Sequence, residues 1–554
     1  MKSHTRSLIL LVLLGYFFLM VGNGSISLTH PDEVFYMQTA KEMQHRHTWF
    51  TPILFDEPQF EKPFLSYDFF RLARELFGDN DAGARFFPAL FGIIGLLLVY
   101  AIAWMLFQSK RLAFLSGFIL GTTFIYIALS RAVLTDMIFS VMILASVTGF
   151  CMAYVYPSRK TAGILLGFTF SALAVLIKGL LGFVFPVTTV LFFLVFKRDQ
   201  TFVKTWAVPA GLLLFLALAL PWHVVMYKLY GNNFLHEYFS NVHLRRLYTA
   251  EHERLNHWYF YPGLMFAGML PWSLFWIPIF GQLYRMFHKK EKRRLNVEFL
   301  LAWIFAVLLY TQSATSKLAS YIFPLYPAIA ILFAQYIDEK WQQVEKGGKG
   351  LSFSRIGYIM ILLLVVGSIA GIFVAQDHLS LLKSMKLIYI TVAVAWVVAL
   401  MLLYFNIVRQ YVKMTFALGG ISVVLLFLLY FAVPYIEPWV SCRQVTDLLK
   451  TVDQSDTPVL ASKFYVRGVR YYTDRPVAVI DINGKGFWSP HPIPFLNRDD
   501  MVVNFFKSRP VTYAIVKEGD VMNIKRVLRR LPFKIKEQGE VGGKFILKVS
   551  RLKQ

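Results

Sequence analysis

The chain has 554 residues, of which 56% are hydrophobic and only 16% are charged. A soluble globular protein of this length would carry about a quarter charged residues, so the composition excludes that class. The formal net charge is +24, but many Lys and Arg residues lie in short segments between apolar runs, where they meet lipid headgroups and orient a membrane protein. We therefore expect a polytopic membrane protein with membrane lipids, and no nucleic acid, as partners.

The N-terminal stretch MKSHTRSLILLVLLGYFFLMVG has the charged start and apolar core of a signal peptide. It lacks an A-x-A cleavage site, so we interpret it as a retained first helix. Apolar runs of transmembrane length then recur along the chain. The thirteen predicted spans lie near residues 8–27, 84–107, 112–130, 133–155, 161–177, 179–196, 203–226, 261–283, 297–314, 318–337, 355–376, 386–406 and 412–434.

The basic connections, such as QSKR, PSRK and YRMFHKKEKRR, all fall on the same side as the N-terminus. The positive-inside rule makes that side cytoplasmic. Two long loops, 28–83 and 227–260, then lie on the opposite, outer side of the membrane. The second loop contains an amphipathic stretch around Phe234–Val242, which predicts a helix in the membrane interface.

The last part of the chain changes character. The runs TPVLAS, RPVAVID, VTYAIVK and GKFILKVS are typical of strands, and CRQVTDLLKTV is typical of a helix. We therefore expect a transmembrane domain over residues 1–434 and a small α/β domain over 435–554, on the outer side because the number of spans is odd. The two cysteines, Cys151 and Cys442, do not form a disulfide framework.

Charged and polar residues of the predicted spans and loops gather on the outer face. They are Asp32, Glu33, Glu61, Lys62, Arg85, Arg131, Asp136, Lys178, His243, Arg245, Arg246, His252, Glu253, His257, Lys317 and Tyr321. Each also has an ordinary interpretation: a loop carboxylate is solvated, Asp136 caps a helix, an arginine contacts lipid phosphate, and a lone histidine is structural. Lys178, placed between two apolar spans, is costly unless it reaches the interface or meets an anion.

Taken together, these residues indicate group transfer on a phosphate-bearing lipid. Cations suit a phosphate or pyrophosphate headgroup, and a nearby carboxylate can activate a hydroxyl or stabilise an oxocarbenium charge. No glycine-rich nucleotide loop occurs, so no nucleotide cofactor and no ATP-driven pump are expected.

An ordered series of short motifs carries a family resemblance over roughly residues 1–440. The series comprises DE after the first span, EKP in the first loop, R-x-x-P-A-L-x-G from Arg85, TDM, KG, H-x-x-R, GMLPWS and SKLASYIFPLYPA. It resembles the bacterial lipid-linked-sugar glycosyltransferases of GT-C fold that are related to protein O-mannosyltransferases. Within them it is most similar to the transferases that carry 4-amino-4-deoxy-L-arabinose from undecaprenyl phosphate to lipid A.

The resemblance implies a role for each matching residue. Asp32 would be the essential acid and Asp136 would shape the sugar pocket, which makes these two the catalytic candidates. The donor phosphate would be held by Lys62, Arg85 and Lys178, with Arg246, Lys317 and Tyr321 as further donor-binding candidates. A divalent metal, zinc or magnesium, is associated in this family with residues that match Glu61 and His252.

The resemblance implies an inverting glycosyltransferase of a bacterial inner membrane, with its site and C-terminal domain facing the periplasm, that moves a sugar from a polyprenyl phosphate donor to lipid A or a related envelope acceptor. The alternatives are a mannosyl- or hexosyltransferase of the same fold acting on protein or core oligosaccharide, a lipid-linked-sugar flippase, and a non-catalytic assembly factor. A flippase would need polar residues along a path through the bilayer. An assembly factor would tolerate the loss of single outer carboxylates.

Overall fold

A computed structural model describes residues 2–198, 201–251, 255–288, 295–348, 350–377, 385–489 and 491–552. The chain forms two compact units, one comprising Met1–Asn23 with Arg85–Phe431 and the other Gly24–Ala84 with Ala432–Gln554. We call them the membrane unit and the C-terminal unit. This grouping differs from the expected division at residue 434, because the first long loop packs with the C-terminal residues.

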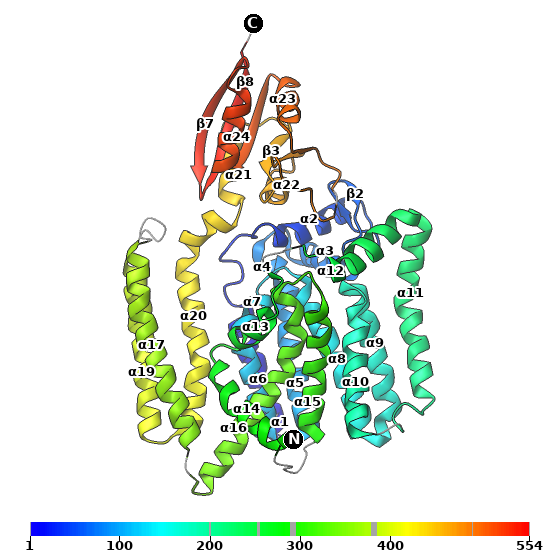
Figure 1. Cartoon of the computed structure of the whole chain (residues 1–554), viewed down its shortest axis with the longest axis vertical. Helices are drawn as coiled ribbons and strands as arrows, with labels where there is room; N and C mark the ends of the chain where they lie inside the picture. The colour runs from blue at the N-terminus through cyan, green and yellow to red at the C-terminus, as the bar shows by residue number, and fades with distance from the viewer. Residues whose placement is uncertain are drawn as a thin grey trace. The chain divides into compact units, whose positions relative to one another are not determined.

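In the part of the chain that the structure describes, the regular elements of the membrane unit are all helices (Figure 1). Its elements are α1 (Lys2–Gly15), η1 (Tyr16–Met20), α5 (Phe86–Phe107), α6 (Lys110–Gly121), α7 (Phe124–Ser130), α8 (Thr135–Val155), η2 (Pro157–Arg159), α9 (Lys160–Lys178), α10 (Leu181–Lys197), α11 (Ala207–Phe234), η3 (Leu235–Leu244), α12 (Arg245–Tyr248), α13 (Phe260–Gly268), η5 (Ser273–Phe275), α14 (Trp276–His288), α15 (Leu295–Ser313), η6 (Ala319–Leu325), α16 (Tyr326–Glu345), α17 (Leu351–Asp377), α19 (Met385–Ile407) and α20 (Tyr411–Val440), the last of which ends in the C-terminal unit.

The protein is a multi-pass membrane protein. Among the described residues, nine helices are long and apolar enough to cross a membrane, or up to eleven when two bent pairs count as one span each. Those pairs are α6 with α7, bent by 66°, and α13 with η5 and α14, bent by 117°. Two shorter apolar helices, His4–Met20 and Leu181–Lys197, lie at the remaining predicted spans. The predicted polytopic helical fold is confirmed.

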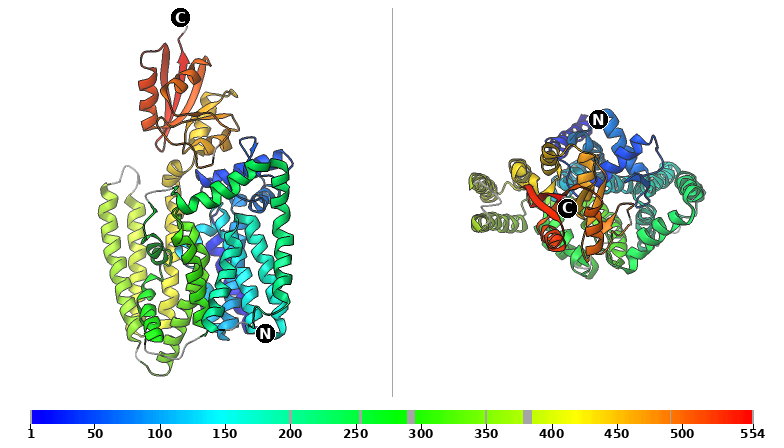
Figure 2. Two further views of the ribbon diagram at one scale, coloured as in Figure 1. Left: turned by 45° about the vertical axis from the view of Figure 1, so that its right-hand side comes forward. Right: turned by 90° about the horizontal axis from the view of Figure 1, so that it is seen from above.

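The closest helix packing in the membrane unit depends on small residues. An added Cβ at Gly149 of α8 would lie 2.6 Å from the Gly167 nitrogen of α9, and one at Gly163 would lie 2.6 Å from the Ala153 nitrogen. Ser146 of α8 also donates a hydrogen bond to the Gly167 carbonyl at 2.7 Å. Small residues let backbones approach in a membrane, where no hydrophobic effect drives helices together. Helices α17 and α19 form another neighbouring pair, clearly visible in Figure 2.

A helix is present where the sequence predicts one in the membrane interface. Gly231, with a φ of 55°, breaks α11, and η3 follows it as a π-helix. Phe234, Tyr238 and Val242 of the expected apolar stripe are buried. The helical spacing read from the sequence therefore describes a real packed face.

The C-terminal unit contains both helices and strands. Its elements are α2 (Asp32–His45), β1 (Ile53–Leu54), β2 (Glu57–Pro58), α3 (Leu65–Phe77), α4 (Asp81–Ala84), α21 (Arg443–Val452), β3 (Val459–Ser462), α22 (Val466–Thr473), β4 (Val477–Ile480), β5 (Phe495–Leu496), α23 (Asp499–Lys507), β6 (Val511–Lys517), α24 (Glu518–Leu528), β7 (Phe533–Val541) and β8 (Lys544–Arg551).

A six-stranded sheet of order β5-β4-β3-β6-β8-β7 forms the core of this unit. The first four strands are parallel and β7 and β8 are antiparallel, with Leu460 opposite both Ala478 and Ala514. The apolar side chains of α23 and α24 join the buried cluster around Leu460 and Leu547. The predicted α/β domain is confirmed.

Candidate functional site

Lys178 and Asp136 form an ion pair at one end of the membrane unit. Lys178 is the last residue of α9, Asp136 is the second residue of α8, and these two helices are antiparallel neighbours. The Lys178 ammonium lies 2.5 Å from the Asp136 carboxylate, and the two side chains are 15% and 8% exposed. The ammonium also lies 5.5 Å from the ring centre of Phe139 and 5.3 Å from that of Tyr321. A charge that the sequence places between apolar spans thus meets a carboxylate and two aromatic faces.

Tyr321 connects this pair to the second outer loop. The Arg246 guanidinium donates to the Tyr321 hydroxyl at 3.4 Å and forms an ion pair with Glu251 at 2.9 Å. The Arg246 carbonyl accepts from the Ser316 amide at 3.1 Å, and the Ser316 hydroxyl accepts from the Glu251 amide at 3.3 Å. Four predicted site residues, Asp136, Lys178, Arg246 and Tyr321, therefore belong to one set of contacts.

Lys317 lies in the same turn, next to Ser316. Its side chain is 3% exposed, its ammonium donates to the His257 carbonyl at 3.2 Å, and it lies 5.8 Å from the ring centre of Tyr261. Burial lowers the pKa of this ammonium. A second buried cation thus adjoins the Arg246 turn.

Arg85 directly precedes α5, and its side chain contacts the residues that follow the first helix. It is 2% exposed and donates to the Asn23 carbonyl at 2.7 Å. Arg131 acts similarly on the Phe18 and Val21 carbonyls, at 3.1 and 2.8 Å. Both guanidiniums satisfy carbonyls where the first helix ends, which gives each a structural role beside any role in phosphate binding.

Asp32 is the first residue of α2 in the C-terminal unit, and its side chain is exposed. Glu33 is buried and accepts from the amide and the hydroxyl of Thr29, both at 2.9 Å. Glu33 therefore fixes the start of the helix. Asp32 lies beside the positive end of the helix dipole.

Glu61 and Lys62 lie in the turn before α3. Lys62 is 8% exposed and its ammonium donates to the Glu61 carbonyl at 3.2 Å. The Gln59 side chain accepts from the Glu61 amide at 3.0 Å and donates to the Tyr67 hydroxyl at 2.7 Å. The EKP motif is thus held in a fixed backbone conformation.

The two predicted metal ligands are Glu61 and His252, and His252 lies outside the described residues. Glu61 is half-buried and lies near His491. Desolvation and the Arg467 guanidinium lower the pKa of His491 to about 4, although the Glu61 carboxylate opposes them. Arg467 donates to the His491 Nε2 at 3.1 Å. No group of three or more potential metal ligands occurs among the described residues. These residues alone do not make a metal site.

Several contacts of these sites were not foreseen from the sequence. Glu251 pairs with Arg246, and its position directly before His252 in the stretch TAEHER was the only available signal. Arg467 and His491 come from the C-terminal domain, more than four hundred residues from Glu61 in the sequence, and no local pattern could have identified them.

Comparisons with known proteins agree with this fold. The profile of the dolichyl-phosphate-mannose-protein mannosyltransferase family matches residues 7–236. An uncharacterized protein of Aquifex aeolicus is 32% identical over 357 residues, which are 64% of this chain and 68% of that relative. The undecaprenyl phosphate-alpha-4-amino-4-deoxy-L-arabinose arabinosyl transferase of Photorhabdus laumondii is 26% identical over 324 residues, 58% of this chain. The match spans 57% of that relative, little more than half its length.

A solved structure extends the likeness to the whole chain. The crystal structure of ArnT from Cupriavidus metallidurans bound to undecaprenyl phosphate has a TM-score of 0.77 and 18% sequence identity. It covers 98% of this chain and 97% of its own, so the fold is shared in both units. The chain belongs to the family of GT-C membrane glycosyltransferases related to the protein O-mannosyltransferases.

Proposed function

We propose that the protein transfers a sugar, 4-amino-4-deoxy-L-arabinose, from undecaprenyl phosphate to lipid A or a related envelope acceptor, with inversion at the anomeric carbon. The observation that carries the proposal is the set formed by Lys178, Asp136, Tyr321 and Arg246. The names of the curated relatives support the choice of sugar and carrier.

The chemistry of this set fits a donor that is an anionic lipid. Lys178 and Arg246 present cations at the end of an apolar unit, and Lys317 adds a third cation nearby. A phosphate between them would accept charge-assisted hydrogen bonds, with an ammonium as a point charge and a guanidinium as a fork. The carboxylates of Asp136 and Glu251 neutralise two of these cations. We propose that the donor phosphate shares or displaces these partners, and that Lys62 and Arg85 complete its binding.

Asp32 is proposed as the acid–base group of the reaction. Transfer breaks the bond between the anomeric carbon and the phosphate oxygen and forms a bond to an acceptor oxygen, and undecaprenyl phosphate leaves. A phosphate acceptor is already an anion and needs no base, so Asp32 then orients groups and stabilises the positive charge at the anomeric carbon. A hydroxyl acceptor loses its proton to Asp32.

Metal dependence stays a prediction. If a divalent ion binds, Glu61 and His252 are its proposed ligands, and no step above passes through it. The test is to treat purified protein with a chelator and then to measure its metal content and its donor binding. A metal-free protein that is active and binds the donor as before would rule out a metal requirement.

We further propose that the site and the C-terminal unit face the periplasm across the inner membrane. Ion pairs and hydrogen bonds join the basic connections at one end of the membrane unit, for example Arg111 with Asp338 at 2.5 Å and Lys160 with the Thr201 carbonyl at 3.1 Å. The Lys178 set belongs to the opposite ends of the helices. A reporter fused at the C-terminus should be periplasmic and one fused in the loop 289–294 cytoplasmic; two reporters on one side would contradict this orientation.

The function is tested by mass spectrometry of lipid A and of lipid-linked sugars from cells with and without the gene. The proposal predicts that the aminoarabinose-modified lipid A disappears and that its undecaprenyl phosphate donor accumulates. Loss of a sugar from protein or core oligosaccharide instead would show a related transferase with another acceptor. An unchanged envelope would contradict the proposal.

A further inference from the structure

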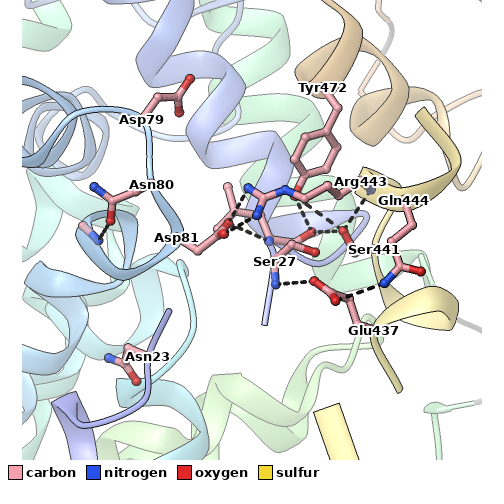
Figure 3. Close-up of polar contacts among 12 residues, drawn as sticks. Asn23, Ser27, Asp79, Asn80, Asp81, Glu437, Ser441, Arg443, Gln444 and Tyr472 are labelled. Atoms are coloured by element: carbon pink, nitrogen blue, oxygen red, sulfur yellow. Dashed lines mark hydrogen bonds and ion pairs between the residues drawn. The ribbon is translucent and has the colours of Figure 1, made fainter. Parts of the chain in front are cut away.

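Two segments of the C-terminal unit, residues 27–30 and 437–443, run side by side. Thr29 and Ser441 form an antiparallel bridge, and the His30 amide donates to the Val440 carbonyl at 2.9 Å. The Ser441 hydroxyl donates to the Leu28 carbonyl at 2.9 Å. Figure 3 shows Ser27 of the first segment and Glu437, Ser441 and Arg443 of the second. The chain continues from His30 through Pro31 to Asp32, so the contact fixes the backbone just before the proposed catalytic residue.

Asp81 and Arg443 join these two segments to α4. The Arg443 guanidinium donates to both oxygens of Asp81, at 2.7 and 3.2 Å (Figure 3). The Leu28 amide also donates to Asp81, at 3.1 Å. Asp81 is 9% exposed and Arg443 is 40% exposed. A bidentate pair with one buried partner is stronger than an ordinary surface ion pair, and the removal of Arg443 leaves a buried carboxylate without its cation.

Further contacts stiffen the segment 437–443. The Ser27 amide donates to Glu437 at 2.9 Å, and the Tyr472 hydroxyl donates to the Leu28 carbonyl at 3.1 Å. The ammonium of Lys544, which is fully buried at the start of β8, donates to the Pro438 and Trp439 carbonyls at 2.6 and 3.1 Å. A lysine at the end of α20 satisfies carbonyls that have no partner within the helix. The sheet of the C-terminal domain thus holds the end of α20, and that end holds residues 27–30.

We propose that Arg443 is a positioning residue for the transfer reaction: through Asp81 it fixes residues 28–30 and thereby the position of Asp32. The inference rests on the proposed function. It assigns to the C-terminal domain a part in catalysis, because the backbone before Asp32 has its hydrogen-bond partners in residues 437–443 and in Asp81. Arg443 itself touches no reacting group in this account.

Positioning has a kinetic signature that simple stabilisation lacks. A misplacement of about 1 Å can lower the rate about 10²-fold. Loss of Arg443 should therefore lower kcat while donor KM changes little, because most of the cations proposed to hold the donor, Arg85, Lys178, Arg246 and Lys317, belong to the membrane unit. A purely structural role would lower the amount of folded enzyme and leave kcat per folded molecule and KM unchanged.

The experiment compares Arg443→Met, Arg443→Lys and Asp81→Asn with Arg526→Met in the full-length protein. Arg526 pairs with Asp499 at 3.0 Å inside the same domain, and both side chains are more than half exposed, so the same substitution there is a matched control. We expect kcat per folded molecule to fall about 10- to 100-fold in Arg443→Met, with donor KM within about twofold of the wild type. Arg443→Lys should recover part of the rate, Arg526→Met should be unchanged, and the double variant Asp81→Asn/Arg443→Met should be no worse than the worse single variant.

A second readout does not depend on activity. Hydrogen exchange of the amides of Leu28 and His30 should become faster in Arg443→Met and stay at the wild-type rate in Arg526→Met. Unchanged exchange, or an unchanged kcat, would overturn the positioning role. If the wild type transfers no sugar while the exchange result holds, the proposed function fails and the mechanical link between Arg443 and residues 28–30 stands.

Discussion

Lys178 carries its charge at the end of an apolar helix, and its surroundings explain why that charge persists there. The Asp136 carboxylate at 2.5 Å and two aromatic rings replace the water that the ammonium loses. An ion pair in such a place is a weak source of stability, because desolvation offsets much of the attraction. Its position beside Tyr321 and Arg246 therefore favours a functional reason for keeping it.

Replacement of Lys178 by Met tests this at the level of one side chain. The substitution removes the charge and keeps most of the apolar length, so we expect transfer to fall at least about 10²-fold while membrane insertion persists. Lys197→Met is the matched control, since Lys197 ends α10 and lies over the Tyr154 ring at 4.2 Å, outside the Lys178 set. Turnover and detergent-extracted yield of both variants are the measurements. Normal turnover of Lys178→Met would exclude a role in the donor site.

Asp32→Asn keeps the shape of the side chain and removes its charge. The side chain is exposed and Glu33 makes the capping contacts, so folding should survive. We expect a loss of about 10²–10⁴-fold in rate, the range typical of acid–base help, with donor binding retained. Steady-state transfer and donor binding by purified protein separate the outcomes. Weaker binding at an unchanged maximal rate would make Asp32 a binding residue.

The sequence could identify only those site residues that are unusual for their surroundings, such as charged residues beside apolar spans. Lys178 and Lys317 are charges between apolar spans, and Asp136 opens one. Their partners could not be found in this way. Asp81 and Arg443 are ordinary charged residues 362 positions apart, and only the folded chain brings them together.

At the scale of elements, α8 and α9 determine the geometry of the Lys178–Asp136 pair, because the two residues stand at adjacent ends of these helices. Their separation depends on Gly149, Gly163 and Gly167. We predict that Gly149→Ala separates the helices, costs about 1–3 kcal/mol of stability and lowers transfer. Gly371→Ala in α17 is the control, since an added Cβ there meets nothing within 4 Å. Equal thermal stability and turnover in both variants would mean that the packing of α8 against α9 does not determine the geometry of the Lys178–Asp136 pair.

The element pattern in the sequence predicted most of the fold, and the exceptions have physical causes. All thirteen expected spans coincide with apolar helices, and four predicted strand runs became β3, β4, β6 and β8. Strand β5 has two residues, too few for a periodic signal, and β7, with the sequence FKIKEQGEV, is too polar to stand out. The packing of residues 24–84 with the C-terminal domain was not foreseen, because it depends on contacts between distant segments.

At the scale of the molecule, we expect the buried side chain of His30 to make the C-terminal unit sensitive to acid. Burial, with the nearby Lys544 ammonium, lowers the pKa of His30 from 6.5 to about 3, and its Nδ1 lies 3.7 Å from the Cys442 sulfur. Below about pH 6.5, His30 binds a proton in the unfolded chain but stays neutral in the folded chain. The free energy of unfolding therefore decreases as the pH falls below this value. Asp68 acts oppositely, since burial raises its pKa to about 8 and favours the folded state at low pH.

A comparison of the wild type with His30→Asn separates the effect of His30 on stability from that of Asp68, because both proteins contain Asp68. His30→Asn cannot titrate, so its midpoint of thermal unfolding should fall less than that of the wild type between about pH 7.5 and about pH 5. His45→Asn, at the exposed last residue of α2, should behave as the wild type. Parallel pH profiles for wild type and His30→Asn would show that His30 is not neutral in the folded unit.

The membrane unit carries buried cations, and the C-terminal unit carries Asp32 and the EKP loop. We propose that the protein transfers a sugar from a polyprenyl phosphate. The most direct measurement is transfer by purified protein in lipid nanodiscs, with undecaprenyl phosphate-linked aminoarabinose as donor and lipid A as acceptor, followed by mass spectrometry. The account predicts aminoarabinose-modified lipid A and free undecaprenyl phosphate in equal amounts with the wild type, and neither product with Lys178→Met. Intact donor in the presence of well-folded wild type, with lipid A and with protein or core oligosaccharide as acceptor, would contradict it.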